Sequence, residues 1–283
     1  MDPITQGVLG AVVPQSIAGN NKVGVAGVFG FIAGMAADLD IFIKSATDPL
    51  LFLEYHRQIT HSLVFIPVGG VVTGFILFSI LGKRVNISFL ESWLICTIGY
   101  GTHGLLDVCT TYGTAIFWPF NNDRIAWGII SIVDPLFTIP VILMIIFCVV
   151  KKTSIFARLG LLWMVSYLLL GLFNQGTAIE AGHKLALDRG HKDIKIDARP
   201  SFANIWLWKI IYEVDDRYYV DAVHTGLNQR VFKGQSIAKV KLSEDFPWLD
   251  PGSQQFLDFK RFEWFSMGYA AVDPKRKYHI GDI

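Results

Sequence analysis

Two long stretches without a charged side chain constrain this chain more than any other feature of its sequence. Residues 62–82 and 159–179 contain no Asp, Glu, Lys, Arg or His. As a helix, each is long enough to cross the hydrocarbon core of a bilayer, for which about 20 residues suffice. Shorter apolar runs surround them. We therefore predict an α-helical membrane protein with about six membrane helices, the others lying in residues 3–21, 23–37, 92–101 and 135–150.

The composition agrees with a membrane protein and excludes other classes. Charged residues make up 17% of the chain and hydrophobic residues 52%, whereas soluble domains carry about a quarter charged residues. A net charge of +1 leaves no excess of basic side chains for nucleic acid, so we expect no nucleic-acid partner. Cys96, Cys109 and Cys148 form no CxxC pair, and neither a zinc knuckle nor a disulfide framework is indicated.

The basic residues between the apolar runs predict an orientation. Lysine and arginine follow the first, third and fifth runs, as Lys22, Lys83-Arg84 and Lys151-Lys152, and such loops are typically cytoplasmic. Alternating helices then bring the N-terminus and the acidic and histidine-rich helix ends to the extracytoplasmic face. The polar residues predicted on that face are Asp2, Asp38, Asp40, His56, His61, His103, Asp107 and Asp134.

His103 and Asp107 form the most informative pair on that face. They lie four residues apart, which puts them on one side of a helix, one turn from each other. An imidazole and a carboxylate at the end of an apolar run are costly to bury without a partner. A metal ion would stabilise both, and so would a structural hydrogen bond between them; the spacing alone leaves both explanations open.

His56 and His61 enclose Arg57 in the next polar segment. Five residues apart on a regular helix, the two histidines would diverge by about 140°. They converge only if the backbone breaks between them, where a loop enters a helix. Arg57 could then hold a phosphate or neutralise a carboxylate. The alternative is an ordinary polar loop at the membrane interface.

Asp38 and Asp40 end the second apolar run. Residues two apart diverge on a helix, but at a helix end both carboxylates can turn toward one centre, where they would suit a hard or borderline cation. A solvated helix terminus is the alternative. Asp is unfavourable at a helix C-terminus because of the macrodipole, so the pair requires a nearby positive charge.

Two further residues are candidates for the site. Asp134 precedes Pro135 and suits a helix cap as well as a ligand. Arg124 follows a turn-like segment, residues 118–123, and could join Arg57 as an anion clamp. No nucleophile elbow, Walker loop or GxGxxG motif supports other chemistries.

The composition changes after residue 180, and we divide the chain into a helical membrane domain, residues 1–180, and a small β-rich extracytoplasmic domain, residues 198–283. Strands are predicted at 205–212 and 217–224, joined by a hairpin loop at 213–216, with further short strands around Val231 and at 262–269. The sequence stops at Ile283 without an obvious cap or tail, which is typical of a truncated chain.

Four motifs together resemble the YdjM-type inner-membrane proteins of bacteria. They are Met1-Asp-Pro-Ile-Thr-Gln-Gly, Ala37-Asp-Leu-Asp, His56-Arg-Gln-Ile-Thr-His-Ser and His103-Gly-Leu-Leu-Asp, and the likeness covers about residues 1–180. The resemblance implies a multi-pass inner-membrane metal-dependent hydrolase, distantly related to zinc-dependent phospholipases C and nucleases. Many relatives have Thr-His where this chain has Thr5-Gln6, which weakens any claim for an N-terminal ligand. Carried over residue by residue, the resemblance implies the metal ligands Asp38, Asp40, His56, His61, His103 and Asp107.

The leading hypothesis is a membrane-embedded metal-dependent hydrolase that uses metal-activated water on a phosphoester, with a phospholipid as one candidate substrate. Zinc is the favoured ion and manganese the alternative. Arg57 and Arg124 would bind the substrate phosphate. The rival hypothesis is a non-catalytic scaffold with a structural metal site and a partner-binding β domain. The sequence does not indicate the oligomeric state. The residues assigned to catalysis are Asp38, Asp40, Arg57 and Asp134, one aspartate acting as general base.

Overall fold

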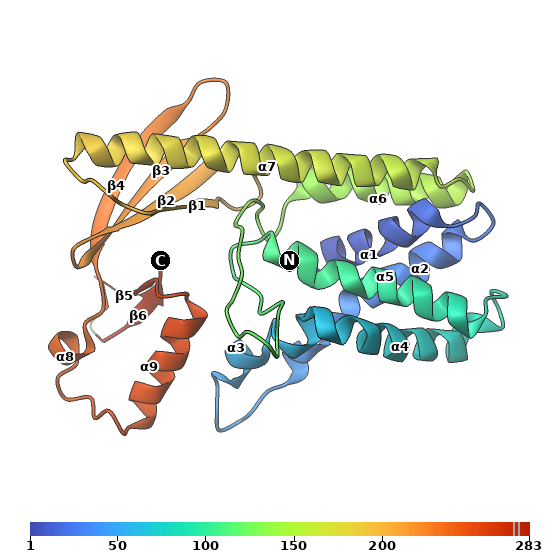
Figure 1. Cartoon of the computed structure of the whole chain (residues 1–283), viewed down its shortest axis with the longest axis horizontal. Helices are drawn as coiled ribbons and strands as arrows, with labels where there is room; N and C mark the ends of the chain where they lie inside the picture. Colours follow the sequence, from blue (N-terminus) through green and yellow to red (C-terminus); the bar gives the residue numbers. More distant parts are fainter. Residues whose placement is uncertain (274, 277) are drawn as a thin grey trace. The chain divides into compact units, whose positions relative to one another are not determined.

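A computed structural model describes residues 1–273, 275–276 and 278–283, and these form two compact units (Figure 1). The first unit contains Met1–Ile43, Tyr55–Gly171 and Phe202–Asn204, and the second contains Lys44–Glu54, Leu172–Ser201 and Ile205–Ile283. This division differs from the predicted boundaries in three places, the first of which is Phe202–Asn204 in the first unit. The loop 44–54 and the C-terminal part of the last long helix both belong to the second unit.

Helices build the first unit, and each of the six apolar runs coincides in part with one helix. Figure 1 shows four of these helices, α1, α2, α4 and α5, packed side by side. The helices are α1 (Pro3–Ile17), α2 (Val23–Met35), α4 (Ile66–Leu77), α5 (Phe89–Val108), α6 (Pro135–Val150) and α7 (Ile155–Asp188). Short turns connect them: the 3-10 helices η1 (Ala36–Phe42), η2 (Ile59–His61) and η3 (Leu63–Phe65), and the π-helix η4 (Phe78–Gly82).

The prediction of six membrane spans is not supported. Among the described residues, three helical stretches are long and apolar enough to cross a bilayer: Val23–Phe42, Leu63–Gly82 and Ile155–Asp188. Helices α1 and α6 have 15 and 16 residues, fewer than the approximately 20 that a span requires. Helix α5 has 20 residues, but its polar side chains, including Glu91, His103 and Asp107, lower its mean hydropathy.

Glycines allow α1, α2 and α5 to approach one another closely. A Cβ at Gly10 would lie 2.4 Å from the carbonyl oxygen of Gly30, and a Cβ at Gly99 would lie 2.7 Å from the same oxygen. Small residues at helix crossings permit such backbone contact. Three segments distant in sequence therefore pack together at their backbones. A hydrophobic core beside this crossing contains Phe29, Ala33, Ala37, Leu77, Ile87, Cys96 and Tyr100.

Helix α5 is fixed at its start by a capping box. The Ser88 side chain accepts a hydrogen bond from the backbone N–H of Glu91, whose side chain bonds back to the Ser88 N–H. From there the helix continues without a break to Val108. His103 and Asp107 therefore lie one turn apart on one helix, as their spacing predicts.

The second unit contains a small antiparallel sheet, as predicted. Its four strands are ordered β1 (Ile196–Pro200), β2 (Leu207–Val214), β3 (Arg217–His224) and β4 (Arg230–Ala238). The predicted hairpin is confirmed: Val214 pairs with Arg217, and Asp215 in the turn has a φ of 52°. The same unit holds α3 (Leu51–Tyr55) up to Glu54, α8 (Leu242–Asp245), α9 (Gln254–Phe265) and the strand pair β5 (Ala270–Val272) and β6 (Ile280–Asp282).

The predicted strand at residues 262–269 is wrong, because residues 262–265 form the last turn of α9. Ser253 caps this helix by accepting a hydrogen bond from the backbone N–H of Phe256. The aromatic side chains that suggested a strand instead recur at helical spacing; Phe262 and Phe265, three residues apart, have ring centroids 6.5 Å apart. Strand β5 begins only at Ala270.

Candidate metal centre

His103 points its Nε2 toward His61, in the interior of the first unit. Its side chain is fully buried, and Nδ1 lies 2.6 Å from the carbonyl oxygen of Gly34 on α2. A carbonyl only accepts hydrogen bonds, so Nδ1 carries a proton and Nε2 is the ring nitrogen that can bind a metal. Imidazoles that bind metal are typically oriented by such a hydrogen bond on the other nitrogen.

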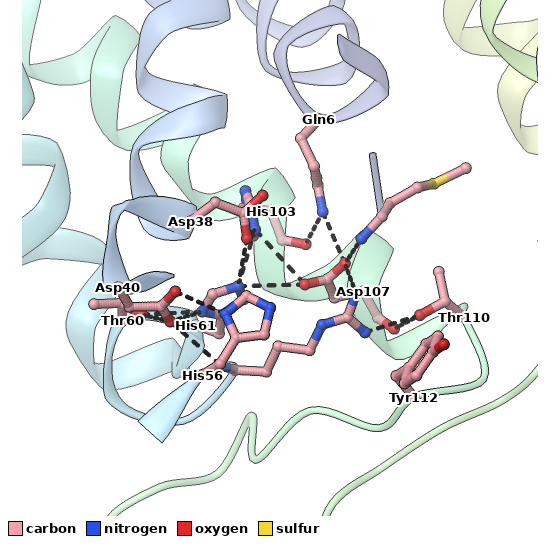
Figure 2. Close-up of polar contacts among 12 residues, drawn as sticks. Gln6, Asp38, Asp40, His56, Thr60, His61, His103, Asp107, Thr110 and Tyr112 are labelled. Carbon is pink, nitrogen blue, oxygen red and sulfur yellow. Dashed lines mark hydrogen bonds and ion pairs between the residues drawn. The ribbon is translucent and has the colours of Figure 1, made fainter. Parts of the chain in front are cut away.

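Asp107 is held with one oxygen occupied and the other available. Its Oδ1 accepts from the N-terminal amino group, from Gln6 Nε2 at 2.9 Å, and lies 3.3 Å from Arg57 Nη2. Its Oδ2 is buried and accepts no hydrogen bond from the described residues. Oδ2 lies 3.3 Å from His61 Nε2 and 3.6 Å from His103 Nε2 (Figure 2). A buried carboxylate oxygen without a hydrogen bond requires another positive partner.

A chain reversal brings His61 to the same point. Arg57 has a φ of 65°, in the left-handed region, and the short helix η2 follows it. The ring centroids of His56 and His61 are consequently 5.5 Å apart, which confirms the predicted break between them. Gly104 makes room for this turn, because a Cβ there would lie 2.3 Å from the carbonyl oxygen of His61.

Helix η1 continues α2 and directs two carboxylates at His61 from opposite sides. Asp38 Oδ1 lies 3.4 Å from His61 Nε2 and 3.3 Å from His103 Nε2. Asp40 Oδ2 instead lies 3.3 Å from His61 Nδ1, and Asp40 Oδ1 lies 2.7 Å from His56 Nδ1. Both aspartates reach His61, but they contact different nitrogens of its imidazole and so do not turn toward one centre.

The six predicted ligands thus fall into two groups of possible metal donors, and each group's donor atoms lie within 4.8 Å of one another. We call Asp38, His61, His103 and Asp107 the primary donor group, and Asp40, His56 and His61 the secondary donor group.

The spacing in the primary donor group fits an ion of zinc size. With metal–ligand bonds of about 2.0–2.2 Å, two ligands of a tetrahedral ion lie about 3.3–3.6 Å apart. The two histidine Nε2 atoms are 3.0 Å apart, and the four distances from them to the Asp38 and Asp107 oxygens are between 3.3 and 3.6 Å. The four histidine–aspartate separations match the distances that coordination requires, whereas the two Nε2 atoms would have to move apart by a few tenths of an ångström to bind one ion.

The secondary donor group is better described as support for His61. Both Asp40 oxygens already take part in hydrogen bonds: Oδ1 with His56 at 2.7 Å, and Oδ2 with the Thr60 hydroxyl at 2.8 Å and the Arg57 backbone N–H at 3.3 Å. A separation of 2.7 Å is a hydrogen bond rather than the distance between two ligands of one ion. Asp40 and Thr60 orient the His61 ring, as carboxylates beside metal-bound histidines do.

The charge around His61 favours a cation between these side chains. Burial disfavours the imidazolium, but the carboxylates of Asp107, Asp38 and Asp40 outweigh it and raise the pKa of His61 to about 10. A proton on His61 therefore satisfies the surrounding carboxylates when no metal is bound. A divalent ion would replace that proton with a larger positive charge.

The two arginines predicted to bind an anion occupy different surroundings. Arg57 is 6% exposed, donates from Nη1 to Thr110 Oγ1 at 3.1 Å, and lies beside Asp107. Arg124 donates to the carbonyl oxygens of His56, Tyr112 and Gly113 and so ties two loops together. Burial, followed by the charge of Arg57, lowers the pKa of Arg124 to about 10.

Asp134 is not brought into either donor group. It caps α6 by accepting hydrogen bonds from the backbone N–H groups of Leu136 and Phe137 at 3.1 and 3.2 Å. Its other oxygen accepts from the Tyr167 hydroxyl at 2.9 Å. Of the two roles that the Asp-Pro sequence suggested, the structure shows the cap.

Three side chains near the donors were not anticipated from sequence. Gln6 reaches from α1 to Asp107 (Figure 2). The only indication of this role in the sequence was a polar glutamine within an uncharged, apolar run. Thr60 contacts both Asp40 and His61. Tyr100 donates its hydroxyl proton to the Thr60 carbonyl at 2.7 Å, which anchors η2 to α5.

Helices apolar enough to cross a bilayer, together with a buried cluster of histidines and aspartates, define the class as an α-helical membrane protein with a possible metal-binding group. Residues 1–178 match the family described as YdjM inner membrane protein, so the chain belongs to that family. All six donors lie within the matched residues.

Among known proteins, the inner membrane protein YbcI of Escherichia coli (strain K12) is similar to this chain, with 31% identity over 108 residues. The aligned region covers 36% of this chain and 60% of that relative's length. No solved structure matches. The kinship with zinc-dependent phospholipases and nucleases that the sequence motifs implied stays a prediction.

Proposed function

We propose that this protein is a metal-dependent hydrolase of the inner membrane that holds one divalent ion in the primary donor group. The observation that carries the proposal is the closeness of four donor atoms, one of them a buried Asp107 oxygen that accepts no hydrogen bond from the described residues: the two histidine Nε2 atoms lie 3.0 Å apart and 3.3–3.6 Å from the carboxylate oxygens. Two imidazoles and two carboxylates favour zinc, with manganese as the alternative.

The proposed reaction is hydrolysis of a phosphoester. A bound divalent ion supplies an acidified water molecule and positive charge for a phosphoryl oxygen. Asp38 is the donor on the accessible side, because its side chain is 16% exposed whereas those of His61, His103 and Asp107 are fully buried. Asp38 is therefore placed to accept a proton from an incoming water as general base.

Positive charge close to the donors supports a phosphorylated substrate. The guanidinium of Arg57 lies 3.3 Å from Asp107 and 5.7 Å from the Tyr112 ring centroid, so it remains within the site. Arg57 would stabilise negative charge on the substrate phosphate. A phospholipid is the candidate substrate because the surrounding helices are apolar enough to lie in lipid.

The basic residues support an extracytoplasmic site. Lys22, Lys83 and the pair Lys151-Lys152 flank one end of each of the three candidate spans. If these ends are cytoplasmic, the opposite ends face the other side. Asp38 lies near the opposite end of the first span, His61 lies just before that of the second, and the opposite end of the third belongs to the second unit.

A structural metal site is the second candidate, favoured by one observation: four protein donors are enough to close a tetrahedral shell. In that case the ion would join η1, η2 and α5 without a position for water. The partial exposure of Asp38 supports the enzyme over the structural site, since water could compete with its carboxylate for the ion.

The test compares detergent-purified wild type with His61→Ala/His103→Ala by elemental mass spectrometry and by turnover of a chromogenic phosphodiester and of phospholipid in mixed micelles. We expect one zinc or manganese ion per chain and turnover in wild type, and neither in the variant. Metal without turnover, in both substrates, would favour the structural site. A folded wild type that binds no supplied metal would contradict both candidates.

A further inference from the structure

The loop 44–54 connects the two halves of the donor cluster. Asp38 and Asp40 precede it in the chain, and His56 and His61 follow it. The loop itself belongs to the second unit, whereas the donors at both of its ends belong to the first. Whatever restrains this loop therefore also restrains two pairs of donors through the covalent chain.

One side chain of the second unit, Arg261 on α9, binds the loop at two places. Its Nη1 and Nη2 lie 2.9 and 3.0 Å from the two Asp48 oxygens, a bidentate arrangement. Its Nε and Nη2 lie 3.1 and 2.9 Å from Glu54 Oε2. Asp48 and Arg261 are 213 residues apart in sequence, so this contact joins the C-terminal region to a segment inside the family-matched residues.

The charges at this contact make Arg261 hard to replace. Asp258, one turn earlier on α9, lies 3.4 Å from Arg261 Nη1, so the guanidinium faces three carboxylates. The hydrogen bonds from Arg261 lower the pKa of the Asp48 carboxyl. An isolated exposed ion pair contributes little, but a bidentate arginine shared among several carboxylates has defined geometry. Without Arg261, mutual repulsion would drive the loop carboxylates away from α9.

Local bonds give the loop a defined shape for Arg261 to hold. The backbone N–H groups of Thr47 and Asp48 donate to Ser45 Oγ at 3.2 Å, and the N–H of Leu50 donates to Asp48 Oδ1 at 3.1 Å. Asp48 thus takes part in the turn and also accepts the two hydrogen bonds from Arg261. Glu54 lies two residues before His56, so the contact between Arg261 and Glu54 is close to the donors in the chain.

We propose that Arg261 is a positioning residue for the metal centre, through which the C-terminal region controls metal affinity. Holding Asp48 and Glu54 fixes the middle and the C-terminal end of the loop and reduces the conformational entropy that the donors lose when an ion binds. The inference rests on the proposed metal site and adds its regulation: release of the loop from α9 lowers occupancy of the primary donor group without changing any ligand.

The test measures zinc affinity of the full chain in detergent by competition with a chromophoric chelator. We expect Arg261→Ala and Arg261→Glu to weaken zinc binding about tenfold or more, the effect typical of residues that orient ligands. Adding Asp48→Arg to Arg261→Glu restores an ion pair of reversed polarity and should recover most of the affinity. Lys260→Ala is the matched control, because Lys260 pairs with Glu263 on its own helix at 2.9 Å.

Amide hydrogen exchange separates positioning from misfolding. In Arg261→Glu we expect faster exchange in residues 44–54 with unchanged exchange in α4 and α5, and the double variant should reverse it. Wild-type zinc affinity in Arg261→Glu, or no recovery in the double variant, would overturn the inference even if the metal site is real. Failure of the wild type itself to bind zinc would instead contradict the proposed function.

Discussion

His61 presents its two ring nitrogens to two different partners: Nε2 lies 3.0 Å from His103 Nε2, and Nδ1 lies 3.3 Å from Asp40 Oδ2. One imidazole therefore belongs to both donor groups. Because Asp40 is hydrogen-bonded by several other groups, we interpret it as the residue that orients His61 and not as a ligand of the same ion.

Replacing Asp40 and replacing Asp107 should consequently have different effects. Asp40→Asn preserves the shape of the side chain and should weaken zinc binding about 10–100-fold while leaving the stoichiometry at one ion. Asp107→Asn removes the charge of a ligand and should abolish stoichiometric binding. Chelator competition measures the first and elemental mass spectrometry the second. Equal losses in the two variants would make Asp40 a ligand.

Gly104 should tolerate no side chain. In Gly104→Ala the new Cβ would meet the His61 carbonyl oxygen at 2.3 Å, so η2 must shift and metal affinity should fall. Gly101→Ala is the control on the same helix, where the nearest atom to the new Cβ is the Ile66 Cγ2 at 3.3 Å. Alanine favours a helix over glycine by about 1 kcal/mol, so the control should be neutral or stabilising. Thermal unfolding and zinc titration compare the pair; identical behaviour would contradict the predicted clash.

Asp134 should contribute to stability and not to metal binding. Asp134→Ala removes the cap of α6 and the partner of the Tyr167 hydroxyl. The loss of a cap costs about 0.5–2 kcal/mol, and the unpartnered hydroxyl adds to it. We expect a lower melting temperature with unchanged metal content per folded chain. Loss of metal in a folded Asp134→Ala would return this residue to the list of candidate ligands.

Stabilisation by metal should increase with pH. The metal-free fold raises the pKa of His61 from 6.5 to about 10, so the charged His61 contributes stability that is complete below about pH 6.5 and is lost as pH rises through about 10. Zinc requires neutral His61 and releases its proton. The difference in melting temperature with and without zinc, at free zinc held constant by a chelator buffer, should therefore be larger at pH 9 than at pH 6.5. His61→Ala should remove this dependence.

Gln6 should strengthen the site without binding the ion. Its Nε2 donates to the occupied oxygen of Asp107 and so directs the other oxygen to the histidines. Gln6→Ala should weaken zinc binding and lower the melting temperature, because a buried carboxylate loses a hydrogen bond. Gln15, buried on the same helix and bonded to the Val23 carbonyl, provides the matched variant Gln15→Ala. That variant should destabilise the fold but retain the wild-type zinc affinity of the folded protein.

The sequence by itself determined the features that depend on local spacing. A spacing of four places His103 and Asp107 on one face of α5, the apolar runs become helices, and alternation of side chains produces the β2–β3 hairpin. For His56 and His61 the spacing gave only a condition: side chains five residues apart can converge only where the helix is broken between them.

Only the tertiary structure decided how the donors divide. Asp38, His61 and His103 meet because glycines let α1, α2 and α5 touch and because Gly104 accepts η2; spacing along the chain encodes neither contact. The same applies to Asp134, where the Asp-Pro sequence allowed a cap or a ligand and α6 uses the cap. It also applies to Arg261, whose partners lie more than 200 residues away. Periodicity is a local property of the backbone, whereas the convergence of side chains depends on which helix surfaces pack together.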